Sequence, residues 1–237
     1  MRVRRHRAII GVGIIIAVIA SFAIAQNYND KLWGQDASES GFNIPESILL
    51  LRMFATAKKG IVYCYSGDSK ATGFFVSADG WILTAGHKVD QDFPQQNKIY
   101  VKLSRVGNSP VYESVKIAPP LEGHDIMLFK IDYKPDHYFK RLKSAYLFEE
   151  HWVVGYRGEA GISVSGPGFI ANHMARRSMH YSTARAYFGN SGSPALNRQG
   201  DVIGVVVMVV GGLWDTYLVP APVAEKYIKD TLKGERK

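Results

Sequence analysis

The sequence predicts an all-β fold of two six-stranded antiparallel β-barrels, with a short C-terminal helix and an N-terminal membrane-targeting helix. From Gly60 onward the chain is made of short apolar runs separated by turn residues. The runs fall into two sets of about six, as in a pair of small barrels. Helical periodicity returns only after Pro222, so helices do not separate the strands as they would in a parallel sheet.

The first set of strands forms barrel one, predicted at about residues 59–135. Asp79-Gly80 stands between two apolar runs, and this dipeptide is a strong hairpin signal. Cys64 lies in the first run, where cysteine usually acts as a small buried hydrophobic residue. The predicted strands are Ile61–Tyr65, Gly73–Val76, Trp81–Thr84, Ile99–Leu103, Val111–Ile117 and Ile126–Ile131.

The second set forms barrel two, predicted at about residues 144–224. Its runs are rich in β-branched and aromatic residues and are bounded by glycine, proline and serine, which is typical of short strands. The predicted strands are Ala145–Phe148, Trp152–Tyr156, Ile162–Val164, Ser178–Thr183, Val202–Val210 and Thr216–Val219.

Helices are predicted on either side of the two barrels. The leucine-rich residues 45–58 follow Pro45 and Glu46, which favours a short opening helix. An apolar helical face is predicted after Pro222, and residues 231–237 are predicted as a basic tail. That face consists of Val223, Tyr227, Ile228 and Leu232.

The N-terminal residues 1–25 are a targeting segment. Four arginines precede residues 8–25, which are almost wholly apolar, and a run of about 18 such residues behind positive charge is typical of membrane insertion. We expect an uncleaved signal anchor followed by a polar tether at residues 26–44. The alternative is a signal peptide cut near Ala25, which ends a small-x-small pattern. Both place the remaining chain outside the cytoplasm, either anchored to the membrane or as a secreted or periplasmic protein.

Charge and composition exclude several classes of function. The formal net charge is +8, but four of the positive charges are the N-terminal arginines, and no basic stripe is interleaved with aromatic residues. Nucleic-acid binding is therefore not expected. A single cysteine rules out an internal disulfide framework, and the seven histidines form no HExxH motif. We expect neither a metal nor a cofactor.

Three segments carry the residues of a nucleophilic site. His87 follows a predicted strand, Asp125 opens another, and Ser191 stands in Gly189-Asn190-Ser191-Gly192-Ser193-Pro194. A lone histidine or a turn aspartate is often structural, whereas the glycine-flanked serine is specific. In this interpretation Ser191 is the nucleophile, His87 its general base and Asp125 the carboxylate that orients the imidazole.

Glycines around the serine let the backbone bend sharply and bring amide groups beside the hydroxyl. The amides of Gly189 and Ser191 are predicted to form an oxyanion hole. The order His, Asp, Ser differs from the Ser, Asp, His order of α/β-hydrolases. The other nearby carboxylates, Asp90, Asp92 and Asp132, are interpreted as solvated turn residues.

The three segments resemble those of trypsin-like serine proteases of the chymotrypsin fold (the PA clan), nearest to the HtrA/Deg and glutamyl endopeptidase branches. The matching residues are Thr84-Ala85-Gly86-His87, Asp125-Ile126-Met127-Leu128-Phe129 and Gly189–Pro194. The resemblance implies a trypsin-like peptidase domain at residues 45–230. The chain also departs from the HtrA pattern, because no peptide-binding PDZ domain is expected after its protease region.

The resemblance also implies where a specificity pocket would lie. Its floor would be at Arg185 and one wall at Val207, Met208 and Val209. No acid stands at the floor, so a preference for Lys or Arg is not expected. An Arg185 turned to solvent predicts cleavage after small or medium apolar residues, and an inward Arg185 would attract Glu or Asp.

These observations predict a serine endopeptidase that cleaves protein or peptide substrates through an acyl-enzyme. Two alternatives remain open: a non-catalytic binding module of the same fold, and an esterase or acyl transferase that uses the same triad. The sequence leaves the natural substrate and the oligomeric state undetermined.

Overall fold

The computed structural model describes the chain from residue 46, with a few short gaps. The predicted membrane helix, the tether, and the carboxylates Asp90 and Asp92 lie outside the described residues. Within them, no helix is long and apolar enough to cross a membrane. The described residues are 46–87, 98–105, 108–158, 161–174, 178–210 and 215–235.

Barrel one is a closed antiparallel barrel in the strand order β1-β2-β3-β6-β5-β4. The turn between β2 and β3 contains Gly80 at φ +93°, a conformation that favours glycine, so the Asp79-Gly80 hairpin is confirmed. Cys64 is buried in β1, as predicted. The strands are β1 (Ile61–Ser66), β2 (Ser69–Phe75), β3 (Trp81–Ala85), β4 (Tyr100–Lys102), β5 (Val111–Ile117) and β6 (Ile126–Ile131).

Barrel two closes in the order β10-β11-β12-β9-β8-β7. The predicted number of strands is confirmed, but one predicted strand is wrong: residues 145–148 form a turn in which the Glu149 amide donates to the Tyr146 carbonyl. The sixth strand of this barrel is instead β10, which was not predicted and whose three residues come at the end of the serine loop. The strands are β7 (Glu150–Tyr156), β8 (Ile162–Met174), β9 (Met179–Ser182), β10 (Pro194–Leu196), β11 (Val202–Val210) and β12 (Asp215–Pro220).

Strand β8 is longer than the predicted Ile162–Val164, because it continues past Gly166 and Pro167. The pairing with β7 steps from Val153↔Ser165 to His151↔Gly168, so the Gly-Pro pair is accommodated where the register shifts. Proline within a sheet is expected at such irregularities, where its missing N–H breaks no ladder bond.

Both predicted helices of the globular part are present, as α2 (Glu46–Lys59) and α4 (Ala221–Gly234). Helix α4 therefore continues into residues 231–234, which the sequence assigns to a tail. It buries Tyr227 and Ile228 against the core. The Tyr227 hydroxyl donates to the Pro119 carbonyl (2.5 Å), which fastens the C-terminal helix to barrel one.

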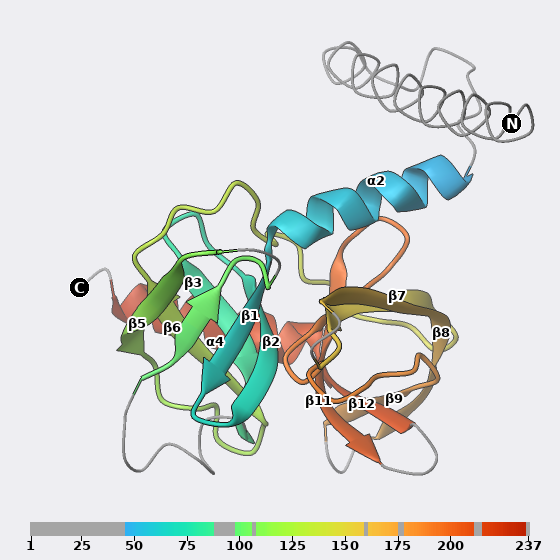
Figure 1. The fold of residues 1–237 in the computed structure, drawn as a ribbon. Helices are drawn as coiled ribbons and strands as arrows, with labels where there is room; N and C mark the ends of the chain where they lie inside the picture. The colour runs from blue at the N-terminus through green and yellow to red at the C-terminus, as the bar shows by residue number, and fades with distance from the viewer. Residues whose placement is uncertain are drawn as a thin grey trace, which may run out of the picture. The chain divides into compact units, whose positions relative to one another are not determined.

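The two barrels lie side by side and share one apolar core (Figure 1). Leu83 and Leu128 of barrel one belong to the same buried cluster as Val154 and Val205 of barrel two. The barrels are therefore held by a continuous core, so residues of one can position residues of the other.

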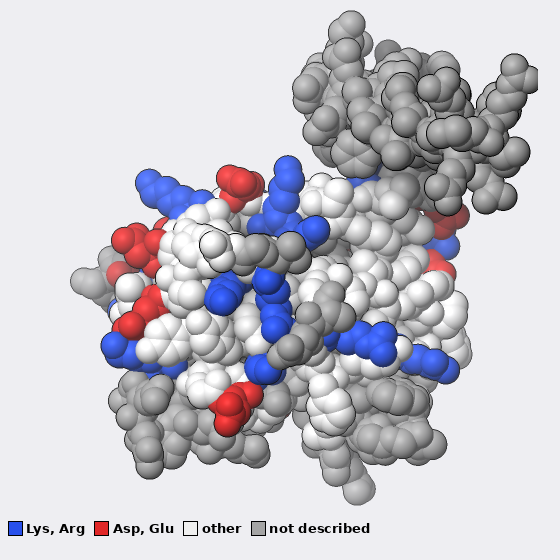
Figure 2. Space-filling model, viewed as in Figure 1, with Lys and Arg blue, Asp and Glu red and all other residues white. Residues whose placement is uncertain are grey.

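Lys and Arg side chains gather along the middle of the face seen in Figure 2.

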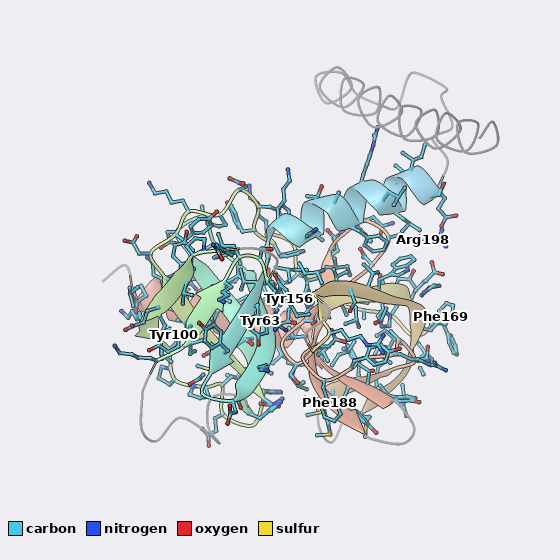
Figure 3. The ribbon with its side chains drawn as sticks, viewed as in Figure 1. Tyr63, Tyr100, Tyr156, Phe169, Phe188 and Arg198 are labelled. Atoms are coloured by element: carbon cyan, nitrogen blue, oxygen red, sulfur yellow. The ribbon has the colours of Figure 1, made fainter. Side chains whose placement is uncertain are left out.

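Polar and aromatic contacts also cross the junction of the barrels. The rings of Tyr63 and Tyr156 meet edge to face with centroids 5.4 Å apart (Figure 3). Arg105 of barrel one lies over the Tyr63 ring and donates from Nη1 to the Gly158 carbonyl of barrel two.

Candidate active site

His87 and Asp125 are brought together by the pairing of β3 with β6. Ala85 is opposite Ile126 in this antiparallel pair, so the residues just beyond them meet at the same edge. The Asp125 carboxylate accepts hydrogen bonds from the His87 backbone amide and from Nδ1 of its ring. Because Nδ1 is engaged, Nε2 is the ring nitrogen left to exchange a proton with another group.

Little room is left for a side chain between the strand and His87. The Gly86 amide donates to the Asp125 carbonyl (3.0 Å), and a Cβ at Gly86 would lie 3.2 Å from Asp125 Oδ1. The side chains of His87 and Asp125 are 29% and 28% exposed, respectively. The pair is thus ordered by the backbone and still reachable from solvent.

Ser191 lies in a sharp loop between β9 and β10. Gly189 and Gly192 have φ values of +96° and +84°, a region that side chains other than glycine rarely adopt. The Asn190 amide donates to the Tyr187 carbonyl (2.9 Å), and the Ser193 amide to the Asn190 carbonyl (2.8 Å). These consecutive turns hold the backbone of Ser191 in one conformation.

Asn190 fixes the same loop through its side chain, which is buried. Its Oδ1 accepts from the Tyr187 amide (2.8 Å), and its Nδ2 donates to the Tyr156 carbonyl on β7 (3.0 Å). Sequence reasoning assigned no role to Asn190, although it stands inside the Gly-Asn-Ser-Gly motif.

The serine loop packs directly on the strands that lead to His87. The Thr72 amide of β2 donates to the Ser191 carbonyl (2.9 Å). A Cβ at Gly192 would lie 2.1 Å from the Thr72 carbonyl oxygen and 2.9 Å from the Ala85 nitrogen. Ser191 is therefore held beside the end of β3, where the His87–Asp125 pair lies.

Two amide groups of this loop have no internal acceptor. Among the described residues, neither the Gly189 nor the Ser191 N–H donates a hydrogen bond within the protein. The neighbouring Phe188 carbonyl instead accepts from the Gly158 amide (2.9 Å). Free amides beside a serine hydroxyl are what an oxyanion hole requires.

The residues expected around a specificity pocket differ in exposure. Arg185 is exposed between the buried Ala184 and Ala186. Val207 is buried and Met208 is 40% exposed, next to a register shift between β11 and β12. The side chain of Val209 lies outside the described residues.

Phe188 is a residue that sequence reasoning missed. Its side chain is 90% exposed, directly before Gly189 (Figure 3). A large apolar side chain so exposed beside the serine loop is available to contact a bound molecule. No sequence signal marks Phe188, because one phenylalanine among apolar runs is ordinary until its exposure is known.

Burial acts on two titratable groups near this site. Burial raises the pKa of Tyr156 to about 12, with a further contribution from Cys64. Burial also raises the pKa of the Cys64 thiol, which therefore stays protonated and is a poor nucleophile. In the part of the chain that the structure describes, no three potential metal ligands come together.

Comparison with known families decides the assignment of the fold. Residues 71–205, more than half of the chain, match the family model of the trypsin-like peptidase domain. The chain belongs to this family. The match includes His87, Asp125 and Ser191, and it spans both barrels.

Curated relatives of this chain include bacterial proteins that are named as proteases. It is 25% identical over 176 residues to a Chlamydia pneumoniae protein named "Probable periplasmic serine endoprotease DegP-like", covering 69% of this chain and 34% of the relative. A protein of the same name from Chlamydia trachomatis serovar D is 26% identical over 151 residues, covering 60% and 29%. The chain thus spans about a third of the length of these relatives.

Solved structures share the two-barrel fold. Deg5 superposes with a TM-score of 0.63 at 17% identity, covering 78% of this chain and 94% of that structure. The protease domain of MamO from Magnetospirillum magneticum (apo form) gives 0.61 at 20% identity, covering 73% and 98%. The described residues, from α2 to α4, therefore form a chymotrypsin-like fold.

Proposed function

We propose that this chain is a serine endopeptidase whose triad is His87, Asp125 and Ser191. One observation carries the proposal: the Asp125 carboxylate binds both the backbone and the ring of His87 beside a glycine-flanked serine loop that packs on β2 and β3. Family membership and the DegP-like relatives support the same activity. The amides of Gly189 and Ser191 complete the proposed site as the oxyanion hole.

In the proposed reaction, Ser191 Oγ attacks the carbonyl carbon of the scissile peptide bond while its proton passes to Nε2 of His87. The carbonyl oxygen becomes an oxyanion and accepts hydrogen bonds from the two free amides. His87 then gives the proton to the departing amine, and the C–N bond breaks to leave an acyl-enzyme. Water activated by His87 hydrolyses the ester and restores Ser191.

Asp125 has two tasks in this scheme. Its hydrogen bond to Nδ1 keeps the neutral ring in the tautomer whose Nε2 accepts a proton, and its charge stabilises the imidazolium that forms. The bond from the His87 amide to the other carboxylate oxygen keeps the carboxylate from rotating away.

The triad is tested by measuring hydrolysis of a fluorogenic peptide mixture by purified variants. Ser191→Ala and His87→Ala are expected to abolish turnover, and Asp125→Asn to lower kcat by about 10⁴-fold because it favours the wrong tautomer. Asp132→Asn is the matched control, since Asp132 is an exposed carboxylate just after β6. Wild-type rates in Ser191→Ala would remove the assignment. Faster hydrolysis of simple esters than of every peptide would favour an esterase.

We further propose that the enzyme acts on proteins or peptides outside the cytoplasm. The DegP-like relatives are named as periplasmic, and the apolar residues 8–25 behind four arginines favour an N-terminal membrane anchor. Cell fractionation with N-terminal sequencing tests this. Membrane recovery with the N-terminus intact supports the anchor, and an exported form beginning at Gln26 supports cleavage. A cytoplasmic protein with residues 1–25 intact would contradict both.

A further inference from the structure

Thr72 in β2 is fully buried and makes two hydrogen bonds to the serine loop and one to strand β7. Its amide donates to the Ser191 carbonyl (2.9 Å), and its hydroxyl lies 2.7 Å from the Gly189 carbonyl oxygen and 2.8 Å from the Tyr156 amide nitrogen. Gly189 is 117 positions away in the sequence. A side chain of barrel one thus contacts the loop that carries the proposed oxyanion hole in barrel two.

The directions of these hydrogen bonds follow from the groups involved. A threonine hydroxyl has one proton to donate and can accept as well. The Tyr156 amide is only a donor, so the hydroxyl accepts from it. The Gly189 carbonyl is only an acceptor, so the single hydroxyl proton is directed to it. The contact is therefore specific for a residue that donates and accepts from the same atom.

The backbone of Thr72 is fixed in turn by the strand that leads to His87. The Thr84 hydroxyl donates to the Thr72 carbonyl (2.7 Å), and Thr84 lies on β3 three positions before His87. Thr72 is thus hydrogen-bonded both to β3 and to the serine loop. The same residue joins the strand of the proposed base to the loop of the proposed nucleophile.

The orientation of the Gly189 amide depends on the two peptide planes beside it. Phe188 and Gly189 share one plane, in which the carbonyl is held by the Gly158 amide and the N–H points the opposite way. The next plane contains the Gly189 carbonyl, held by Thr72. Glycine at φ +96° rotates more freely than other residues, so these two hydrogen bonds set its orientation.

We propose that Thr72 is a positioning residue that holds the Gly189 peptide with its N–H facing the substrate carbonyl, and so couples barrel one to the oxyanion hole. This inference rests on the proposed serine peptidase function. Thr72 itself does not touch the substrate in this scheme. Its loss is expected to reduce stabilisation of the transition state while leaving ground-state binding intact.

The test compares Thr72→Val with Thr72→Ser. Valine keeps the shape and removes both hydrogen bonds, whereas serine keeps the hydroxyl. Loss of one oxyanion donor lowers kcat by about 10²- to 10³-fold, so a misoriented donor is expected to lower kcat by about 10- to 100-fold. KM is expected to change less than about threefold, because substrate binding does not use the oxyanion donor before reaction. Thr72→Ser is expected to stay within about threefold of wild type.

Thr216→Val provides a matched control. Thr216 is also fully buried, but its hydroxyl has no hydrogen-bond partner among the described residues. The same substitution there is expected to leave kcat and KM unchanged. If Thr72→Val does not fold, Thr72→Cys keeps a weak donor and is expected to lower kcat by about 3- to 10-fold, between the serine and valine variants.

A second readout separates positioning from a general loss of stability. A peptide aldehyde forms a tetrahedral adduct with Ser191 and uses the oxyanion hole, whereas a cleaved product peptide does not. For Thr72→Val, aldehyde affinity is expected to fall in parallel with kcat while product affinity is unchanged, at a temperature where circular dichroism shows the variant folded.

The outcomes distinguish this inference from the proposed function. If wild type is active, Ser191→Ala is inactive and folded Thr72→Val retains the wild-type kcat, only the role of Thr72 is refuted. Equal losses in Thr72→Ser and Thr72→Val would also refute it. If activity survives in Ser191→Ala, the proposed function falls and the inference falls with it.

Discussion

Gly192→Ala tests the packing of the serine loop against barrel one. An alanine at φ +84° costs about 1–2 kcal/mol in backbone strain. Its Cβ would also lie 2.1 Å from the Thr72 carbonyl oxygen and 2.9 Å from the Ala85 nitrogen. Backbone atoms yield less than side chains do, so overpacking adds about 1–3 kcal/mol. We expect the free energy of unfolding to fall by about 2–5 kcal/mol.

Gly200→Ala is the matched control for this prediction. Gly200 has a similar φ of +76°, but its nearest neighbour is the flexible Met53 side chain, with Cγ at 3.2 Å from an added Cβ. The control therefore carries the backbone strain of about 1–2 kcal/mol without a backbone clash. The difference between the two variants isolates the contact with β2 and β3.

Guanidinium denaturation measures the stability of both variants, and turnover of a fluorogenic peptide measures the position of Ser191. A displacement of about 1 Å from the reactive geometry costs about 10²-fold in rate, so Gly192→Ala is expected to lose activity to that extent while Gly200→Ala keeps it. If the two variants are equally stable and equally active, the serine loop does not pack on barrel one as described.

Three further predictions concern stability and specificity. Asp201 is buried and forms ion pairs with the exposed Arg141 (2.5 Å) and Lys143 (2.6 Å). Asp201→Asn is therefore expected to lower the free energy of unfolding, measured by guanidinium titration, by about 1–3 kcal/mol. An unchanged free energy of unfolding would show that these ion pairs contribute nothing to stability. Burial, helped by the neighbouring histidine on the paired strand, lowers the pKa of His180 to about 4. The unfolded chain therefore binds more protons than the folded chain between about pH 7 and 4, and the stability of the fold falls as the pH is lowered through this range. His180→Gln is expected to make the melting temperature less dependent on pH across the same range. A peptide-library profile is expected to favour cleavage after small or medium apolar residues and to be unchanged in Arg185→Ala. A profile dominated by cleavage after Glu would make Arg185 a specificity residue. A profile dominated by cleavage after Lys or Arg would contradict both the solvent-facing and the inward-facing interpretation of Arg185.

The fold could be predicted because its strands carry local signals. Asp79-Gly80 marks a hairpin by its turn chemistry alone, and the helix after Pro222 is visible in the spacing of its apolar residues. Strand β10 could not be found in this way, since three residues after a glycine-rich loop have no periodicity. Its strand character comes from pairing with β7 and β11. Residues 145–148 show the converse, because an apolar run became a turn.

The candidate site was predictable only where a short motif names its residues. His87, Asp125 and Ser191 stand in recognisable segments, whereas Thr72, like Thr84 and Thr216, is a strand threonine to which the sequence alone assigns no role. Its importance arises from partners far away in the sequence, which only the closing of both barrels brings together. Asn190 and Phe188 were missed for a related reason, since burial of one and exposure of the other are properties of the folded loop.

Labelling with a fluorophosphonate probe tests the central claim most directly, because such probes react with an activated serine. The labelled protein is digested and the modified residue is identified by mass spectrometry. We predict modification of Ser191 in the wild type, none in Ser191→Ala and strongly slowed modification in His87→Ala. A folded wild-type protein that remains unlabelled, or a label on another residue such as the buried Ser193, would contradict the assignment of Ser191 as the nucleophile.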